Sequence, residues 1–333
     1  MLTDARRLLV RFVLLGIGVV LLNFLIPRLL PGSPLAFSSG AGTDQATPLS
    51  AGSRAQLRAY YGLDDSIRRQ FGSYLRNLSH GDLGASISQR APVSQLILDR
   101  LPWTLGLLLF SITVAACAGT IIGVVAGWHP HRFWDATLVS VASAVAAIPE
   151  FLLAIGLLVV FSVELGWLPL FGGESTFANH GGGGAGLLRH AFDIGRHLTL
   201  PAAALALASA PSFVLIARDT TRGLQHQPYV TVARSKGLRE RDVIRRHALP
   251  NMTFPLLNAL GVRLGGLLGG ALIVERVFSV PGLGLLAYNA IRARDYPVLQ
   301  ALFLLASLGV LTTNFLVEIV QLWAMRRRGW GGV

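Results

Sequence analysis

Few residues of this 333-residue chain could do chemistry, because only 14% of its side chains are charged. His247 could bind a metal or move a proton, but it stands beside two arginines and has no partner at ligand spacing. The four glycines of residues 181–184 could cradle a phosphate, yet a P-loop continues with Gly-Lys-Ser or Gly-Lys-Thr and this run continues with Ala-Gly-Leu-Leu. No Walker-type motif occurs in the sequence. We therefore expect a structural role for His247, a flexible glycine loop, no metal site, no catalytic residue and no ATP hydrolysis by this polypeptide.

Two charged residues lie deep inside long apolar segments, where ionisable side chains are costly and often functional. At about 1.5 Å per helical residue, Glu150 lies roughly 21 Å and Arg263 roughly 18 Å from the expected cytoplasmic ends of their segments. These similar depths suggest that both residues face a translocation pathway and pair with each other, so that a charged substrate could compete with the pair. A buried structural pair, or two charges in separate polar gaps, is the alternative.

The elements that must position these residues are membrane-spanning helices. Hydrophobic residues make up 52% of the chain and the mean hydropathy is +0.55, and a spanning helix needs about 20 apolar residues. The sequence therefore predicts an all-α, polytopic integral membrane protein with about six transmembrane helices. The single cysteine, Cys117, lies in an apolar run and allows no intramolecular disulfide. The predicted spans are approximately residues 9–30, 102–127, 136–163, 198–217, 252–274 and 298–325.

The net charge of +12 follows the predicted topology. Basic residues cluster before the first span, between the second and third, between the fourth and fifth, and after the sixth. This positive-inside pattern places both termini in the cytoplasm and explains the charge without nucleic acid. The first span lacks a small-residue cleavage site and predicts an uncleaved anchor. Residues 31–100 then form an external region, with helix-like pieces at 54–61 and 66–77, which either contacts another protein or is a solvated insertion.

Two predicted spans carry local features of helix geometry. Pro149 lies in the middle of the third span, where a missing N–H and a steric clash predict a kink. Gly261, Gly265 and Gly269 recur at a spacing of four in the fifth span and put small residues along one face. That face packs either within the chain or against a second subunit.

A basic stretch between the fourth and fifth spans, residues 229–251, carries the most specific pattern. Ala233, Gly237 and Leu249-Pro250 resemble the cytoplasmic signature loop of the permease subunits of bacterial ATP-binding-cassette importers. His247 replaces the isoleucine of the general pattern, and Thr231-Val232 replaces Glu-Ala. These departures are typical of the dipeptide, oligopeptide and nickel permease branch. The branch is also matched by Tyr229-Val230, Arg234, Lys236, Leu238, Tyr61-Gly62-Leu63-Asp64, His80-Gly81-Asp82-Leu83-Gly84, Val280-Pro281-Gly282-Leu283-Gly284 and Ala293-Arg294-Asp295-Tyr296-Pro297.

The local physics of this loop predicts a compact pair of short helices. Pro228 suits a first helical turn, and Gly237 can end that helix in a left-handed conformation. A second helix is expected near residues 239–247, before Pro250 leads into the fifth span. The resemblance implies that this knob docks in a groove of an ATPase subunit. Apolar contacts would come from Tyr229, Ala233 and Leu238, and charged contacts from Arg234, Lys236 and Arg239; the alternative is a basic loop on anionic headgroups.

The resemblance also implies the wider assembly. Residues 1–333 would form one transmembrane permease domain of the type I importer fold, with residues 218–250 as the cytoplasmic coupling loop, in the bacterial inner membrane. Its partners would be a second homologous permease, two ATPase subunits that hold ATP and Mg, an external substrate-binding protein, and lipid. Peptides are the expected cargo, with nickel chelates, glutathione and sugars as alternatives. A secondary transporter or a membrane enzyme is the rival from another class, but no inverted repeat and no clustered catalytic groups support either.

Overall fold

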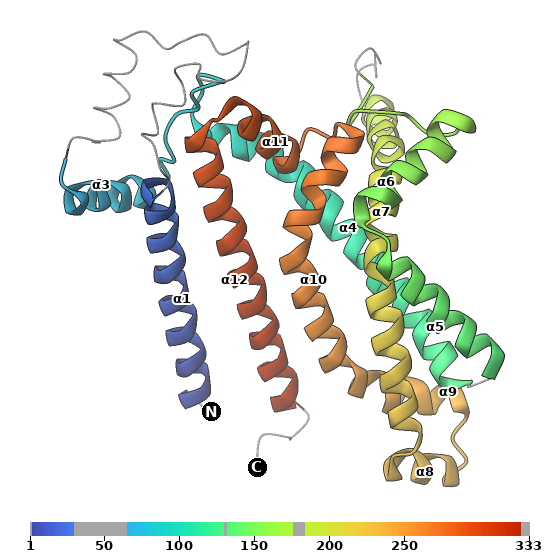
Figure 1. The fold of residues 1–333 in the computed structure, drawn as a ribbon. Helices are drawn as coiled ribbons and strands as arrows, with labels where there is room; N and C mark the ends of the chain where they lie inside the picture. Colours follow the sequence, from blue (N-terminus) through green and yellow to red (C-terminus); the bar gives the residue numbers. More distant parts are fainter. Residues whose placement is uncertain (1, 30–64, 130–131, 176–183, 328–333) are drawn as a thin grey trace. The chain divides into compact units, whose positions relative to one another are not determined.

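The computed structural model describes residues 2–29, 65–129, 132–175 and 184–327. These residues confirm the all-α prediction, because the described part of the chain contains no strand and only one isolated antiparallel bridge, between Ala85 and Pro92. Figure 1 shows the helices in chain order. They are α1 (Leu2–Leu29), α3 (Ile67–Ser79), α4 (Val93–Trp128), α5 (Arg132–Ala147), α6 (Glu150–Leu157), the π-helical η2 (Leu158–Glu164), α7 (Gly184–Gln225), α8 (Pro228–Ser235), α9 (Glu240–Val243), the π-helical η3 (Ile244–Ala248), α10 (Leu249–Phe278), α11 (Leu283–Ala293) and α12 (Tyr296–Arg327).

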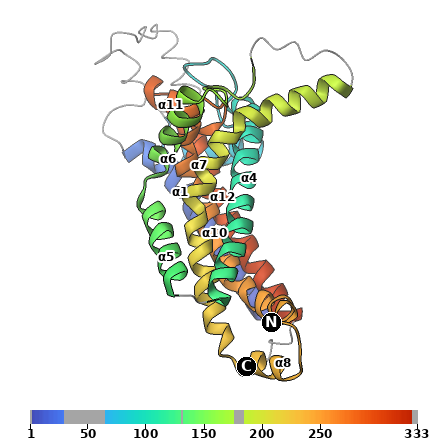
Figure 2. The same ribbon diagram turned by 90° about the vertical axis from the view of Figure 1, so that its right-hand side faces the viewer.

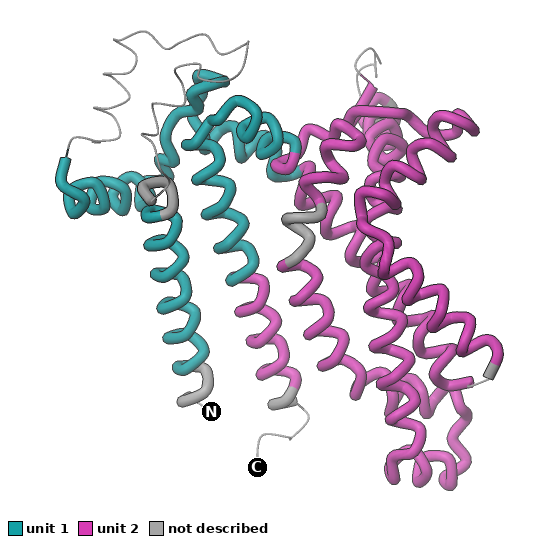
Figure 3. Tube along the Cα trace, in the orientation of Figure 1, with its two compact units in different colours: residues 1–102, 285–311 teal, residues 103–284, 312–333 magenta. Residues whose placement is uncertain are grey.

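The chain divides into two compact units, which are coloured separately in Figure 3. Unit 1 comprises Met1–Pro102 and Leu285–Leu311, and unit 2 comprises Trp103–Gly284 and Thr312–Val333. Unit 2 contains the core of α4, α6, α7 and α10. Its largest buried side chains include Leu107, Leu205, Phe213 and Phe278.

Four described helices are long and apolar enough to cross a membrane without a break. The count rises to six if each of two bent helix pairs forms one span, which agrees with the sequence prediction of about six. The bent pairs are Phe133–Ala147 with Glu150–Glu164, at 96°, and Ala271–Phe278 with Leu283–Ala293, at 86°. The unbroken candidates are Arg6–Leu25, Val93–Trp128, Gly186–Gln225 and Tyr296–Ala324.

The predicted kink at Pro149 is a bend of 96° between the helix before it and the helix after it. α5 ends at Ala147 and α6 begins at Glu150, with Pro149 in an extended conformation (φ −55°, ψ 139°) between them. Because proline has no N–H and clashes with the preceding turn, it favours a break in the helix at this point. The predicted helix at 66–77 is α3, whereas the predicted helix at 54–61 and the glycines at 181–183 lie outside the described residues.

A stripe of glycines brings α4 and α7 into close contact. A Cβ at Gly119, Gly123 or Gly127 would collide with backbone or β-carbon atoms of α7 between Ala210 and Thr221. Small residues every four positions let two helix backbones approach, which is a common way of packing membrane helices. The sequence prediction placed such a face on α10 instead. There, Gly261 packs beside Val317 and Asn314 of α12, within unit 2, and the side chains of residues 266–270 are outside the description.

Two fully buried carboxylates shape turns next to the long helices. In unit 2, Glu275 accepts hydrogen bonds from the Thr104 hydroxyl at 2.7 Å and from the Gly284 amide at 2.6 Å. In unit 1, Asp295 accepts hydrogen bonds from the hydroxyl groups of Ser86 at 2.5 Å and Ser88 at 2.7 Å. Asp295 lies within one of the segments that match the permease branch beyond the loop, and Glu275 binds the backbone of another at Gly284. Both matched segments are therefore turns next to a buried acid.

Candidate functional site

The basic stretch at residues 229–251 forms the predicted knob at one end of unit 2 (Figure 2). α8 starts at Pro228, where the missing N–H costs nothing because the first helical N–H groups have no intrahelical partner. It ends at Ser235, and Gly237, two residues later, has a φ of +74° in the left-handed region. The amide of Gly237 then donates to the Arg234 carbonyl at 2.9 Å. The predicted helix stop at Gly237 is therefore confirmed.

The second half of the knob differs from the prediction in one respect. Instead of a separate helix over residues 239–247, α9 runs into the π-helical segment η3 and then directly into α10. Pro250 lies in the first turn of α10, directly after the π-helical segment. The knob is thus continuous with the long helix that follows it.

A small apolar cluster holds the two halves of the knob together. Trp128, at the end of α4, packs with Val230 and Ala233 of α8 and with Val243 and Ala248 of the second half, all less than 5% exposed. Ala233 was expected to contact an ATPase, but at 3% exposure it faces inward. Its small side chain fits between the two helices, so Ala233 shapes the knob rather than its outer surface.

One ion pair crosses the turn of the knob. The Arg234 guanidinium donates to Glu240 at 2.9 Å and lies 5.3 Å from the ring centre of Trp128, whose indole N–H also donates to Glu240, at 2.8 Å. The hydrogen bond from Arg234, together with that from Trp128, lowers the pKa of Glu240 below its ordinary value of 4.5, against a smaller opposing effect of burial. Arg234 therefore has a partner within its own chain.

Asn251 ties the start of the knob to its end. Its side-chain amide donates to the Tyr229 hydroxyl at 3.1 Å and to the His247 carbonyl at 2.7 Å. This contact holds the Tyr229 hydroxyl and the His247 backbone carbonyl beside Asn251, while the structural role predicted for the His247 side chain stays a prediction. No structural role was predicted for Asn251, although this residue is the last one of the basic stretch at residues 229–251.

Several predicted residues remain on the outer surface of the knob. Tyr229 and Leu249 are 37% and 40% exposed, and Lys236 is also exposed. Leu238 is half-buried against the apolar cluster. The knob therefore exposes both apolar and basic side chains to a partner.

A buried charge cluster beside the knob was missed by sequence reasoning. Asp135 of α5 accepts two hydrogen bonds from Arg218, at 2.6 and 2.7 Å, and one from Arg222, at 2.8 Å, both on the last turns of α7. The side chain of Asp135 is only 12% exposed. The sequence signal that could have revealed this cluster was Asp135 itself, an acidic residue on the side of the membrane where arginines predominate. The cluster fastens α5 to the end of α7 from which the knob starts.

Glu150 and Arg263 lie on helices that pack together, but they form no ion pair. α6, which Glu150 begins, and α10, which carries Arg263, both contact α7 and each other. Arg263 donates from both Nε, at 3.1 Å, and Nη2 to the Ser212 hydroxyl of α7. The Oε2 atom of Glu150 is buried and has no hydrogen-bond partner within the described part of the chain. Opposite charges are therefore brought into one helix cluster without neutralising each other directly.

Comparison with known proteins identifies relatives over most of the chain. Residues 119–329 match the family described as the binding-protein-dependent transport system inner membrane component. A putative peptide transport system permease protein of Brucella abortus (strain 2308) is 35% identical over 302 residues, which are 91% of each chain. The glutathione transport system permease protein GsiC of Escherichia coli O6:H1 is 34% identical over 303 residues, covering 91% of this chain and 90% of GsiC.

A solved structure supports the fold. The MetNI methionine ABC transporter in an inward-facing conformation matches with a TM-score of 0.51 over 68% of this chain and 96% of the matched chain. Sequence identity is 18%, so the match concerns the fold alone. It agrees with the predicted type I importer permease fold.

Proposed function

This chain belongs to the inner membrane components of binding-protein-dependent transport systems, and we propose that it imports peptides or peptide-like solutes such as glutathione. The chain is an importer permease subunit, and the energy comes from separate ATPase subunits that hold ATP and Mg. The remaining partners are a second permease, either a homologue or a second copy, and an external binding protein. Both termini lie in the cytoplasm, on the side of the basic clusters.

The observation that carries this proposal is the knob itself. It is braced internally by an apolar cluster and by the Arg234–Glu240 pair, yet it keeps Tyr229, Lys236 and Leu249 on its surface. A protrusion that is held rigid by internal contacts, and that exposes both apolar and basic side chains, is suited to move as one body when a partner protein binds it. The sequence contains no nucleotide-binding motif, so a partner is the natural source of that movement.

The connections of the knob suggest how movement reaches the pathway. Its first helix follows α7 after two residues, and its second half runs on into α10. The Asp135–Arg218 contact links α5 to the same end of α7. Displacement of the knob would therefore pull on α5, α7 and α10 together and change the packing among the helices that carry Ser212 and Arg263.

The charges of these helices suit a zwitterionic cargo. Glu150 has a buried carboxylate oxygen without a hydrogen-bond partner among the described residues, and Arg263 contacts a neutral hydroxyl. A peptide carries an amino terminus and a carboxylate, so a peptide in transit could meet Glu150 with the first and Arg263 with the second. We place both residues on the translocation pathway for this reason.

Reconstituted transport tests the proposal. The chain would be co-expressed with the proteins encoded beside it, placed in proteoliposomes and supplied with radiolabelled dipeptide, tripeptide or glutathione. We expect uptake of at least one of these solutes that requires both ATP and the external binding protein. Uptake that persists without ATP, or that follows a proton gradient, would instead indicate a secondary transporter.

A further inference from the structure

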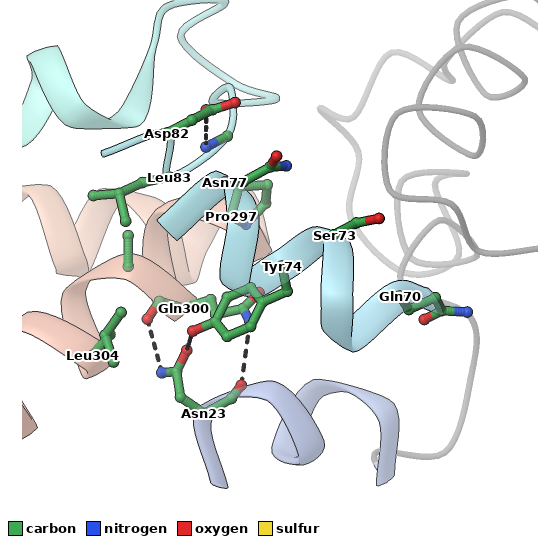
Figure 4. Close-up of a pocket in the computed structure, with 12 residues that line it drawn as sticks. Asn23, Gln70, Ser73, Tyr74, Asn77, Asp82, Leu83, Pro297, Gln300 and Leu304 are labelled. Carbon is green, nitrogen blue, oxygen red and sulfur yellow. Dashed lines mark hydrogen bonds between the residues drawn. The ribbon is translucent and has the colours of Figure 1, made fainter. Parts of the chain in front are cut away.

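The short helix α3 of unit 1 lies across the end of α1 instead of continuing along it (Figure 1). The ring of Phe24 on α1 is 5.0 Å from that of Phe71 and 5.6 Å from that of Tyr74. The Tyr74 hydroxyl donates to the side chain of Asn23 at 3.0 Å, and Asn23 exchanges two further hydrogen bonds with Gln300 of α12 (Figure 4). α3 is therefore fixed on the ends of α1 and α12.

The sequence of α3 has an apolar face and a basic one. At 100° per residue, Ile67, Phe71, Tyr74, Leu75 and Leu78 fall on one side of the helix. Phe71, Tyr74 and Leu78 are half-buried, but Ile67 and Leu75 are 65% and 41% exposed on the same apolar side. The helix also contains three arginines and no acidic residue.

The position of α3 indicates what covers its exposed apolar residues. The apolar part of α1 that can cross the membrane is Arg6–Leu25, so the contacts of α3 with Asn23 and Phe24 lie where the span ends. Leu21 and Leu22, one turn or less before these contacts, are 43% and 58% exposed, as lipid-facing residues of a span would be. The exposed apolar surface of α1 thus continues towards the apolar side of α3.

We propose that α3 is an interfacial helix that rests in the leaflet at the Leu25 end of α1. Ile67 and Leu75 enter the boundary between headgroups and acyl chains, and the arginines of α3 reach the phosphate level with their charged ends. A helix with one apolar stripe and a basic opposite side is suited to this boundary. Lipid contact also holds the segment that follows α3, which the buried Asp295 pins through Ser86 and Ser88, close to the membrane surface.

Spin labels can test this position, because the chain has a single cysteine to remove. The full chain with Cys117→Ser would carry a nitroxide at Ile67→Cys or Leu75→Cys, and at Ser73→Cys as a matched control on the opposite side of the same helix. Each would be placed in nanodiscs of phosphatidylethanolamine and phosphatidylglycerol. Power saturation would then compare collisions with oxygen, which concentrates in lipid, and with a water-soluble nickel chelate.

We expect the labels at positions 67 and 75 to collide several-fold more with oxygen and several-fold less with the nickel chelate than the label at position 73. Equal access of the nickel chelate to all three positions would overturn the proposal. Protection of positions 67 and 75 from both reagents would also overturn it, since protein would then cover the face. Protection that develops only when the external binding protein is added would show a protein docking surface instead of a lipid contact.

Discussion

At the scale of single residues, the knob depends on a few contacts that cross its turn. Glu240 is the most connected of them, because it accepts hydrogen bonds from both Arg234 and Trp128. Its lowered pKa means that the folded knob holds the ionised carboxylate more firmly than the unfolded chain does. This contribution is complete above the ordinary value of 4.5 and is lost as the pH falls through the lowered pKa.

Glu240→Gln should therefore loosen the knob at neutral pH but make little difference in acid. Exposed ion pairs contribute about 0–1 kcal/mol, so faster exchange of the α8 and α9 amides is expected without unfolding of the chain. Hydrogen exchange of the peptides covering residues 228–248 would be compared between variant and wild type at pH 7 and at an acidic pH below the lowered pKa of Glu240, after correction for intrinsic rates. A difference that is as large in acid as at pH 7 would contradict the role assigned to the carboxylate.

Arg263 and Glu150 offer a second prediction at this scale. Arg263→Ala and Glu150→Gln should each reduce peptide uptake by tenfold or more, because about 1.4 kcal/mol of lost interaction in transit corresponds to a factor of ten. Ser212→Ala is the matched control, since it removes the hydroxyl partner of Arg263 but keeps the charge, and it should have a smaller effect. Uptake at the wild-type rate by both charge variants, with normal assembly, would remove these residues from the pathway.

Which residue roles can be predicted from sequence depends on the range of the interaction. The left-handed Gly237 and the proline start of α8 follow from local backbone chemistry, and they were predicted correctly. The inward position of Ala233 and the bonds of Glu240 depend on Trp128, which is about a hundred residues away in sequence. No local pattern contains that information, so these roles became visible only in the folded chain.

At the scale of helices, the close packing of α4 on α7 positions the knob. Gly119, Gly123 and Gly127 face α7, whose end leads into α8. Composition predicted the spans, and Pro149 predicted the break between α5 and α6. The partner of each glycine face could not be predicted, because glycines at a spacing of four occur on both α4 and α10 and the spacing does not name the helix that approaches.

Gly123→Ala should destabilise the protein, because the added Cβ would meet the backbone of α7 at Val214 and Arg218. Overpacking of this kind typically costs about 1–3 kcal/mol. Gly106→Ala on the same helix is the matched control, since a Cβ there has nothing within 4 Å, and it should be neutral or slightly stabilising. Thermal unfolding in detergent would compare the two; equal midpoints would contradict tight packing of α4 on α7.

At the scale of the whole molecule, the knob is the proposed link between an external energy source and a membrane pathway. Family membership and the fold match establish an importer permease. The continuity of the knob with α7 and α10 then provides a physical route for movement. The motif spacing of the sequence predicted the family, and its apolar segments predicted the membrane helices, whereas the coupling role of the knob and the identity of the cargo stay predictions.

The central claim is that an ATPase grips the exposed basic surface of the knob, and capture of that subunit tests it most directly. The wild-type chain, a Lys236→Glu/Arg239→Glu variant, and an Arg68→Glu/Arg69→Glu control on α3 would each be co-expressed with the ATPase encoded beside the chain and purified through a tag. We expect the wild type and the control to retain the ATPase and the knob variant to lose it by tenfold or more, about 1.4 kcal/mol or above. Equal capture by all three chains, or no capture by the wild type, would contradict the account.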